Sequence, residues 1–212
     1  MAQDSHERGN FLRKLLGPSQ AVFLIASSRE GEEALILQAL KQSPLNAKII
    51  IVPRHPQRFD EVARLISQYG FRFCRRSEFS QGNVASEISQ AQIILGDSMG
   101  EMPTYYAASD IAYIGGSLLP FGGQNLIEAC AVGTPILIGP HTFNFAQAAE
   151  MALQAGAAIR VQDVKQLLET AEQLLQHTEQ LAQMSLAAKQ FVSDNQGATQ
   201  KTVALIKQMM AH

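Results

Sequence analysis

The stretch GGSLLPFGGQNLIEACAVGTPILIGPHTFNF, Gly115 to Phe145, carries the pattern that decides the fold of this chain. Two glycine pairs flank a short apolar turn, NLIEACAVG predicts a helix that ends at Gly133, and TPILIGP predicts a buried strand. A further apolar segment, DIAYIGG, precedes the first glycine pair as a strand. Strand, glycine-rich loop, helix and strand in this order predict one unit of a parallel α/β sheet.

The same alternation continues on both sides of this stretch. Strands are expected at residues 21–26, 47–53, 71–74, 91–97, 110–116 and 134–140. Helices are expected at 34–40, 58–70, 102–109, 125–133, 145–155, 163 to about 177, and 179–210 with a break near 193–197. Apolar strands that alternate with helices predict a doubly wound parallel sheet covered on both faces. Residues 1–212 therefore read as a single Rossmann-like α/β domain.

Composition excludes several classes of protein. The 212 residues are 46% hydrophobic and 17% charged, with a formal net charge of -2, which is typical of a globular domain and not of a nucleic-acid surface. Cys74 and Cys130 lie far apart and form no CxxC pair, which argues against zinc and for a reducing, cytoplasmic compartment. No apolar run approaches the roughly 20 residues of a membrane span, so no membrane insertion by this segment is expected.

Four of the loops that follow strands carry unusual residues. They comprise residues 27–32, 53–56, 96–101 and the glycine-rich stretch that begins at Gly115. Ligands of doubly wound sheets bind beyond the carboxyl ends of the strands. We therefore expect these four loops to meet at one edge of the sheet and to form the binding site.

The glycine-rich loop is suited to binding an anion. Gly122 and Gly123 followed by Gln124 and Asn125 at a helix start would offer backbone N–H groups to a phosphate. Asn125 and Glu128 lie three residues apart and would share a helix face, where a carboxylate can accept hydrogen bonds from a sugar diol. Glycine pairs also serve as tightly packed turns, so a purely structural interpretation stays open.

Arg54 is the clearest candidate for contact with a phosphate. It follows an apolar strand directly and lies between Pro53 and His55-Pro56, where the two prolines stiffen the backbone. A guanidinium there can bind a phosphate through two hydrogen bonds, although a solvated loop arginine fits the sequence equally well. Glu101 lies at a predicted helix start, where it can also simply complement the helix dipole.

The segments VPRHPQRF, GDSMGE and Gly115–Phe145, in this order and preceded by SSREGEE, resemble the carboxyl-terminal half of the 3-deoxy-D-manno-octulosonic acid (Kdo) transferases of lipopolysaccharide synthesis. The resemblance runs from Ala21 to Phe145 and extends more weakly to NQGA at 195–198. It implies a GT-B glycosyltransferase of two Rossmann-like halves that transfers Kdo from CMP-Kdo to a lipid A precursor (lipid IVA), with inversion and without metal or cofactor. It also implies a full-length enzyme at the cytoplasmic face of the bacterial inner membrane.

Residues that match the family's motifs form the predicted site. The implied CMP-binding residues are Pro53, Arg54, Met99, Gly100, Glu101, Asn125, Leu126, Ile127 and Glu128. Further possible donor contacts are Ser27, Ser28, Ser117, Gly122, Gly123 and Gln124. The chain departs from the family at Arg29, where histidine is usual, and at Gln124-Asn125-Leu126, where histidine-asparagine-proline is usual. The role of position 29 is therefore not set by the resemblance.

The resemblance implies that the catalytic glutamate and the acceptor site belong to an amino-terminal half. This sequence starts just before the first strand of the second half, so we expect an isolated donor-binding domain that binds but does not catalyse, with no catalytic residue of its own. The glutamates of REGEE are explained as helix-start carboxylates. Two alternatives stay open: a GT-B enzyme that uses a UDP-sugar, and a non-catalytic nucleotide-binding module.

Overall fold

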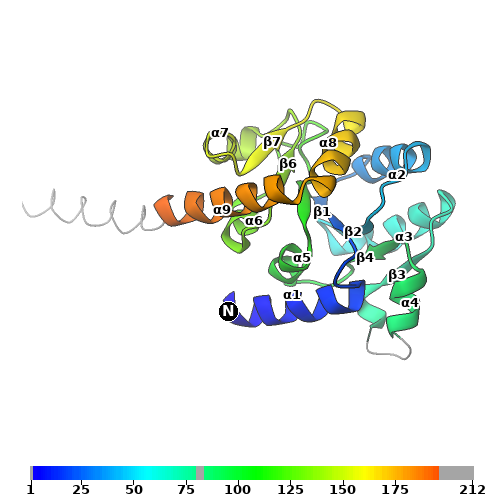
Figure 1. The fold of residues 1–212 in the computed structure, drawn as a ribbon. Helices are drawn as coiled ribbons and strands as arrows, with labels where there is room; N and C mark the ends of the chain where they lie inside the picture. Colours follow the sequence, from blue (N-terminus) through cyan, green and yellow to red (C-terminus); the bar gives the residue numbers. More distant parts are fainter. Residues whose placement is uncertain (1, 80–83, 196–212) are drawn as a thin grey trace, which may run out of the picture.

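The computed structural model describes residues 2–79 and 84–195, and the strands of these residues form one sheet (Figure 1). The strands are β1 Val22–Ser28, β2 Lys48–Pro53, β3 Phe73–Arg75, β4 Ile93–Leu95, β5 Ile111–Ile114, β6 Ile136–Ile138 and β7 Ala158–Arg160. They lie in the order β3-β4-β2-β1-β5-β6-β7, and all neighbouring strands are parallel. The order reverses beside β1, as in a doubly wound sheet.

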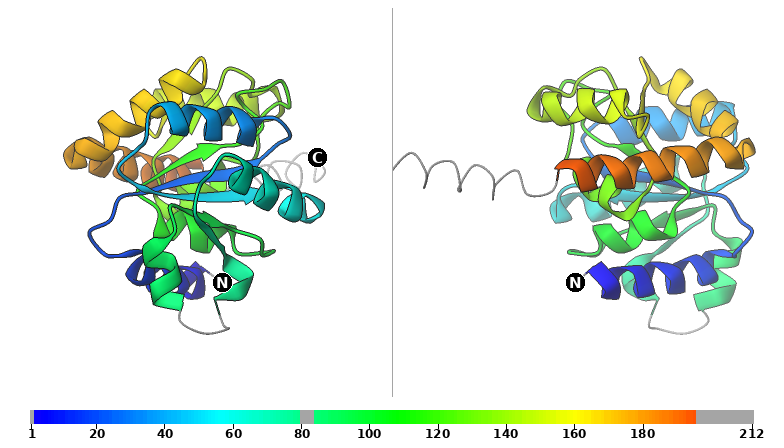
Figure 2. Two further views of the ribbon diagram at one scale, coloured as in Figure 1. Left: turned by 90° about the vertical axis from the view of Figure 1, so that its right-hand side faces the viewer. Right: turned by 60° about the vertical axis from the view of Figure 1, so that its left-hand side comes forward.

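Helices cover both faces of the sheet (Figure 2). The α-helices are α1 Ala2–Leu16, α2 Glu32–Gln42, α3 Phe59–Gln68, α4 Val84–Gln90, α5 Met102–Ala108, α6 Ile127–Val132, α7 Ala146–Gln154, α8 Val164–Gln176 and α9 Thr178–Asn195. The described residues also form three short 3-10 helices, η1 Pro56–Arg58, η2 Arg76–Glu78 and η3 Phe143–Phe145. This arrangement confirms the predicted Rossmann-like fold class.

The alternation of side chains along β1 separates two apolar cores. Phe23 and Ile25 pack with the buried residues of α2, α3 and α8 on one face of the sheet. Leu24 and Ala26 pack on the other face with α1, α5, α6 and α7. Both faces of β1 are therefore buried, which explains why its sequence is a continuous apolar run.

All six predicted strands are present, with shorter bounds than the apolar segments suggested. The edge strand β7, Ala158–Arg160, was not predicted, because Ile159 is its only large apolar residue. Helices α1 and α4 were not predicted either. Gly9 allows α1 to approach α5, since a Cβ there would lie 2.4 Å from the Cβ of Ala107.

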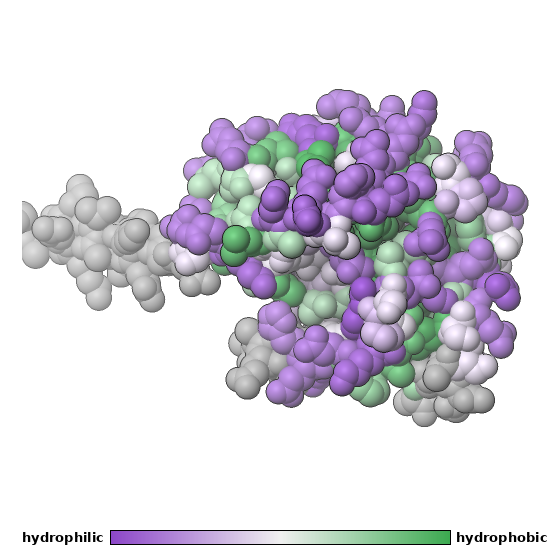
Figure 3. Space-filling model, in the orientation of Figure 1, coloured by the Kyte–Doolittle hydropathy of each residue, from purple (hydrophilic) through white to green (hydrophobic). Residues whose placement is uncertain are grey.

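At the carboxyl-terminal side, α9 is continuous to Asn195, so the predicted break near 193–197 does not occur within the described part of that range. The rest of the predicted helix to 210, and the NQGA resemblance beyond Asn195, lie outside the described residues. Within the described residues, no helix has the length and apolar character needed to cross a bilayer. The face drawn in Figure 3 is largely hydrophilic, and its hydrophobic areas are small and separated.

Candidate functional site

The loops that follow β4, β2, β1, β5 and β6 meet at one edge of the sheet, because these strands are parallel and neighbours in this order. This edge, called the rim below, comprises residues 27–31, 54–58, 96–101, 115–128 and 139–145. The prediction that the four unusual loops converge is confirmed. The loop after β6 joins them.

The end of β1 brings two loops into close contact. Ser27 has a left-handed backbone with φ 54, and the β1–β2 register shifts between Ala26 and Ser28. A Cβ on Gly115 would lie 2.4 Å from the carbonyl oxygen of Ser27, so only glycine fits there. A left-handed non-glycine residue costs about 1–3 kcal/mol and is retained where its surroundings enforce it.

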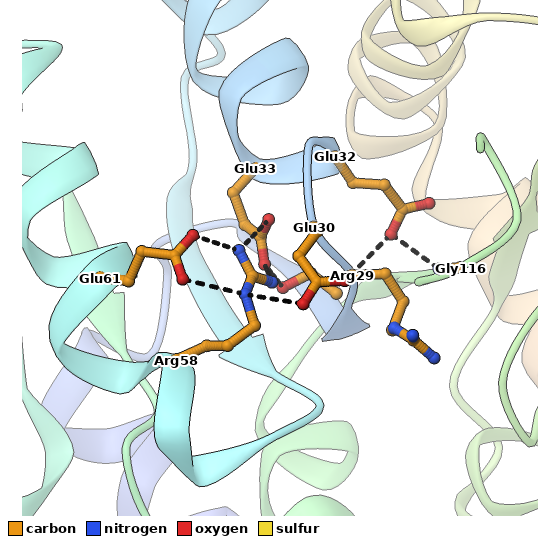
Figure 4. A network of polar contacts seen from close by, with 8 residues as sticks. Arg29, Glu30, Glu32, Glu33, Arg58, Glu61 and Gly116 are labelled. Atoms are coloured by element: carbon orange, nitrogen blue, oxygen red, sulfur yellow. Dashed lines mark hydrogen bonds and ion pairs between the residues drawn. The ribbon is translucent and has the colours of Figure 1, made fainter. Parts of the chain in front are cut away.

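Glu32 joins the loop after β1 to the loop after β5 (Figure 4). Its fully buried carboxylate accepts hydrogen bonds from the backbone N–H groups of Arg29, Gly116 and Leu118 at 3.0, 2.7 and 3.1 Å. The Tyr113 hydroxyl donates to it at 2.6 Å. Burial and then the charge of Glu32 raise the pKa of Tyr113, so this phenol stays protonated and remains a donor.

Arg58 joins η1 to the start of α2 through a cluster of carboxylates (Figure 4). It donates to Glu33 at 2.7 and 3.2 Å and to Glu61 at 3.0 Å, and it lies 3.8 Å from Glu30. Burial alone would lower the pKa of Arg58, but the hydrogen bonds and charges of Glu33 and Glu61 outweigh it and raise the pKa. The Ser28 hydroxyl also donates to Glu33, at 2.7 Å.

The structural explanation of the REGEE glutamates is therefore confirmed for Glu32 and Glu33, although the means differ from those expected. Both are fully buried and hold neighbouring loops through hydrogen bonds, which goes beyond complementing a helix dipole. Sequence analysis did not identify Arg58 or Tyr113. A pair of glutamates at a helix start, followed by an arginine beyond the next strand, is too common a pattern to reveal a buried cluster.

Packing accounts for much of the glycine in the stretch from Gly115 onward. Gly116, Gly122 and Gly123 have φ of 72, 88 and 77, and a Cβ on Gly122 would lie 2.4 Å from Nδ2 of Asn144. Ser117 is fully buried, and its hydroxyl accepts from the N–H of Gly139 at 2.8 Å. The interpretation as a tightly packed turn thus holds for Gly122, while contact of this loop with a ligand remains a prediction.

The helix after the glycine-rich loop begins later than predicted. Helix α6 starts at Ile127, and Asn125 lies before it. The Asn125 side chain accepts from the N–H of Ile127 at 3.0 Å and donates to Glu128 at 3.1 Å. This local bond to the residue two positions on replaces a helical turn, which is the usual behaviour of asparagine before a helix. Asn125 and Glu128 are therefore in contact, but not as neighbours on one helix face.

The predicted site residues differ in exposure. Arg54, Met99, Gly100, Ile127 and Glu128 are exposed, and Glu101, Gln124 and Asn125 are partly exposed. The side chain of Leu126 is buried in the core. The hydroxyls of Ser28 and Ser117 are committed to internal hydrogen bonds. Ser28, Ser117 and Leu126 are buried as whole residues, backbone included, so their contact with a ligand remains a prediction.

The loop after β4 is held by two arginines that sequence analysis left without a role. Arg76 donates to Glu101 at 2.8 Å, and Ser98 donates to the same carboxylate. Arg75 lies 3.3 Å from Asp97. Their position at and directly after the end of β3 was a usable signal, because it places both at the carboxyl end of that strand, next to the loop after β4.

Other features of the described residues lie away from the rim or carry no reactive group. A cavity of about 240 Å³ lies at the opposite edge of the sheet, around Lys48, Arg72 and Gln92, where the strands begin. Burial raises the pKa of Cys74 to about 11 and that of Cys130 to about 12, so neither thiol is a nucleophile near neutral pH. The described residues contain no group of three or more His, Cys, Asp or Glu side chains arranged to hold a metal.

Comparisons with known proteins show which family this chain resembles. The profile of the family Glycosyl transferases group 1 matches residues 85–191. The 3-deoxy-D-manno-octulosonic acid transferase of Bordetella pertussis is 45% identical over 188 residues, which are 86% of this chain and 43% of that protein. The chain thus spans about half the length of the curated relatives it matches.

Two solved structures are among those that share this fold. The C-terminal CMP-Kdo binding domain of WaaA from Acinetobacter baumannii superposes with a TM-score of 0.80 at 32% identity, over 90% of this chain and 98% of that one. HepE from Anabaena, in complex with UDP and glucose, has a TM-score of 0.67 at 17% identity, over 97% of this chain and 52% of that one. The second likeness shows the fold alone.

Proposed function

This chain belongs to the group 1 glycosyltransferases and, among them, to the Kdo transferases, and we propose from this membership that its rim binds the nucleotide sugar CMP-Kdo. The observation that carries the proposal is the match to the CMP-Kdo binding domain of WaaA, which covers 98% of that domain at 32% identity. The match also covers 90% of this chain. The fold, a carboxyl-terminal half of the GT-B type, is the one on which such a site would be built.

The exposed residues of the rim supply the chemistry that CMP requires. Glu128 and Asn125 lie together and would accept and donate hydrogen bonds at the ribose hydroxyls. Arg54 is exposed after β2 and would contact the phosphate. The remaining proposed contacts come from Pro53, Met99, Gly100, Glu101, Leu126, Ile127, Ser27, Ser28, Ser117, Gly122, Gly123 and Gln124.

The reaction that this domain would serve is the transfer of Kdo to a lipid A precursor. A hydroxyl of the acceptor attacks the anomeric carbon, its proton passes to a general base, and the bond from that carbon to the phosphate oxygen breaks as CMP leaves. The acceptor site and the base belong to the amino-terminal half in our proposal. No metal or cofactor is required, and the complete enzyme would act at the cytoplasmic face of the inner membrane.

Titration calorimetry with CMP, UMP, UDP and CMP-Kdo tests the proposal. We expect CMP to bind more tightly than either uridine nucleotide, with modest affinity because part of the donor stays in solvent. Equal or tighter binding of UDP would favour a UDP-sugar enzyme instead. A flat response to all four ligands would favour a non-catalytic module.

A further inference from the structure

Six arginines of the described chain lie at or just beyond the carboxyl ends of strands, and four of them are paired with carboxylates. Arg58 pairs with Glu33 and Glu61, Arg75 with Asp60 and Asp97, Arg76 with Glu101, and Arg160 with Glu150. The other two, Arg29 and Arg54, have no ion pair with any described residue. The rim therefore carries two guanidinium charges without a partner.

Arg29 is fixed in place although its charge is not neutralised. Its backbone N–H donates to Glu32 at 3.0 Å, and its guanidinium carbon lies 4.6 Å from the centre of the Phe121 ring. A Cβ on Gly116 would lie 3.3 Å from Cγ of Arg29, so the arginine stem runs directly over this glycine. Stacking on an aromatic ring restricts the side chain and lowers the entropy cost of binding an anion.

The nearby glutamates do not bind the Arg29 side chain. Glu33 bonds to Arg58, Glu30 lies 3.8 Å from the same arginine, and Glu32 is occupied by N–H and O–H donors. Figure 4 shows the guanidinium of Arg29 pointing away from all three. Its Nε is buried and has no hydrogen-bond partner among the described residues. A buried donor without a partner is a group that a ligand can satisfy.

We propose that Arg29 binds the carboxylate of the sugar acid in the donor. This inference rests on the proposed function: CMP-Kdo carries two negative charges, one on the phosphodiester and one on the sugar carboxylate, and the rim offers two unpaired arginines. Arg54 follows β2 and takes the phosphate. Arg29 follows β1, beside Gly116 and Phe121 of the glycine-rich loop, and takes the carboxylate through its planar pair of N–H groups.

The assignment makes Arg29 a residue that selects among donors. UDP-hexoses have no carboxylate at the sugar, so they would leave this guanidinium without its partner. A site built to bind a charged group discriminates strongly against ligands that lack it. Arg29 would then favour sugar-acid donors independently of the base that the nucleotide carries.

Calorimetry on Arg29→Ala with CMP and CMP-Kdo tests the assignment. We expect CMP-Kdo to bind about 10- to 100-fold more weakly, because a hydrogen bond to a charged group is lost, while CMP affinity changes by less than about twofold. Arg29→Lys should retain part of the preference for CMP-Kdo. Arg64→Ala removes the same charge from the exposed side of α3, outside the rim, and should change neither affinity.

The outcomes separate this assignment from the proposed function. If Arg29→Ala weakens the binding of CMP and of CMP-Kdo equally, Arg29 contacts the phosphate or has a structural role. If neither affinity changes, Arg29 lies outside the binding site. Either result overturns the carboxylate assignment and leaves the proposal of CMP binding intact. If the wild type binds UDP as tightly as CMP, the proposed function itself fails, and the carboxylate assignment with it. Should Arg29→Ala not fold, Arg29→Gln, which keeps the stem over Phe121, replaces it.

Discussion

At the scale of single residues, Glu32 has the largest effect on the geometry of the rim. Its side chain accepts hydrogen bonds from three backbone N–H groups and from the Tyr113 hydroxyl, and it is fully buried. Two of those N–H groups belong to Gly116 and Leu118, which lie 84 and 86 residues away in sequence. The carboxylate thereby sets the distance between the β1 loop and the glycine-rich loop.

We expect Glu32→Gln to lower the free energy of unfolding by about 1.5–3 kcal/mol, the range for hydrogen bonds to a charged group. The amide of glutamine keeps one acceptor oxygen and replaces the other by an NH2 group, so the two donors that faced the replaced oxygen lose their acceptor. Urea denaturation followed by circular dichroism measures the change. Glu179→Gln, at an exposed position of α9, is the control and should have almost no effect. An unchanged midpoint for Glu32→Gln would mean that the buried network contributes no stability.

Glu128 differs from Glu32 because it is exposed and has only Asn125 as a bonded neighbour among the described residues. We expect Glu128→Gln to weaken CMP binding by about 10- to 100-fold without changing stability. Because 2′-deoxy-CMP lacks a ribose hydroxyl for Glu128 to bind, it should bind the wild type poorly, and its affinities for the wild type and for the variant should be nearly equal. Calorimetry with both nucleotides is the measurement, and Glu169→Gln on α8 is the control.

The contrasting variant is Arg54→Ala, which should reduce the advantage of CMP over cytidine. The phosphate supplies that advantage, and Arg54 has no carboxylate partner within the described chain that would compete for it. If Arg54→Ala weakens cytidine and CMP by the same factor, the phosphate contact belongs to another residue. If Glu128→Gln leaves CMP affinity unchanged, the contact with the ribose belongs to another residue.

At the scale of elements, helix α8 shows how local signals set helix ends. The Asp163 side chain accepts from the N–H of Gln166 at 2.8 Å, and the Gln166 side chain accepts from the N–H of Gln162 at 2.8 Å. The pair resembles a capping box, except that Gln166 bonds the residue before the cap and not the cap itself, and the helix then runs to Gln176. The predicted bounds, 163 to about 177, agree because both ends are determined by neighbouring residues.

We expect Asp163→Ala to lower the free energy of unfolding by about 1 kcal/mol, the usual cost of losing a side-chain cap. Asp163→Asn keeps an acceptor oxygen at the same position and serves as the matched control. Thermal unfolding of the two variants should show a lower midpoint for alanine than for asparagine. Equal midpoints would mean that packing of α8 on α2, and not its cap, holds the start of this helix.

Helix α6 and strand β7 mark where local signals were insufficient. From the sequence, Asn125 fits a position inside a helix and a position before a helix equally well. Its hydrogen bond to the N–H of Ile127 places it before the helix. Strand β7 has three residues, and its backbone pairs with β6 only because α7 returns the chain to the sheet edge. β4 and β6 are equally short, but each lies in a longer apolar segment that reveals it, whereas β7 has Ile159 as its only large apolar residue.

At the scale of the whole molecule, the rim is open, and one side of a bound donor would remain in solvent. We expect a polypeptide of these 212 residues to transfer no Kdo to a lipid A precursor on its own. The proposed base and acceptor site belong to the other half of a GT-B enzyme, and the chain spans 43% of its Bordetella relative. A transfer assay with radiolabelled Kdo is the measurement, and calorimetric binding of CMP by the same sample is its control. Turnover by this polypeptide alone would overturn the assignment of the base to the other half.

The sequence by itself determined the order of elements, the parallel sheet and the loops that form the rim. Buried parallel strands are apolar throughout, helices carry their caps and their periodicity within a few residues, and the carboxyl ends of parallel strands always face the same way. The motifs around Arg54, Met99 and Glu128 also indicated the family, because they are contiguous.

Only the tertiary structure decided which charged residues at and near the rim have a partner of opposite charge in the described chain and which do not. Arg58 meets Glu33 across 25 residues, Arg76 meets Glu101 across 25, and Glu32 meets Gly116 across 84. Each bond requires two elements to pack at one distance and angle, and no local pattern encodes that. Arg29 and Arg54 look no different in sequence from Arg58 and Arg76. Both remain without a carboxylate partner in the described chain, and beside Arg29 the packing brings Glu32 and Glu33 to other donors.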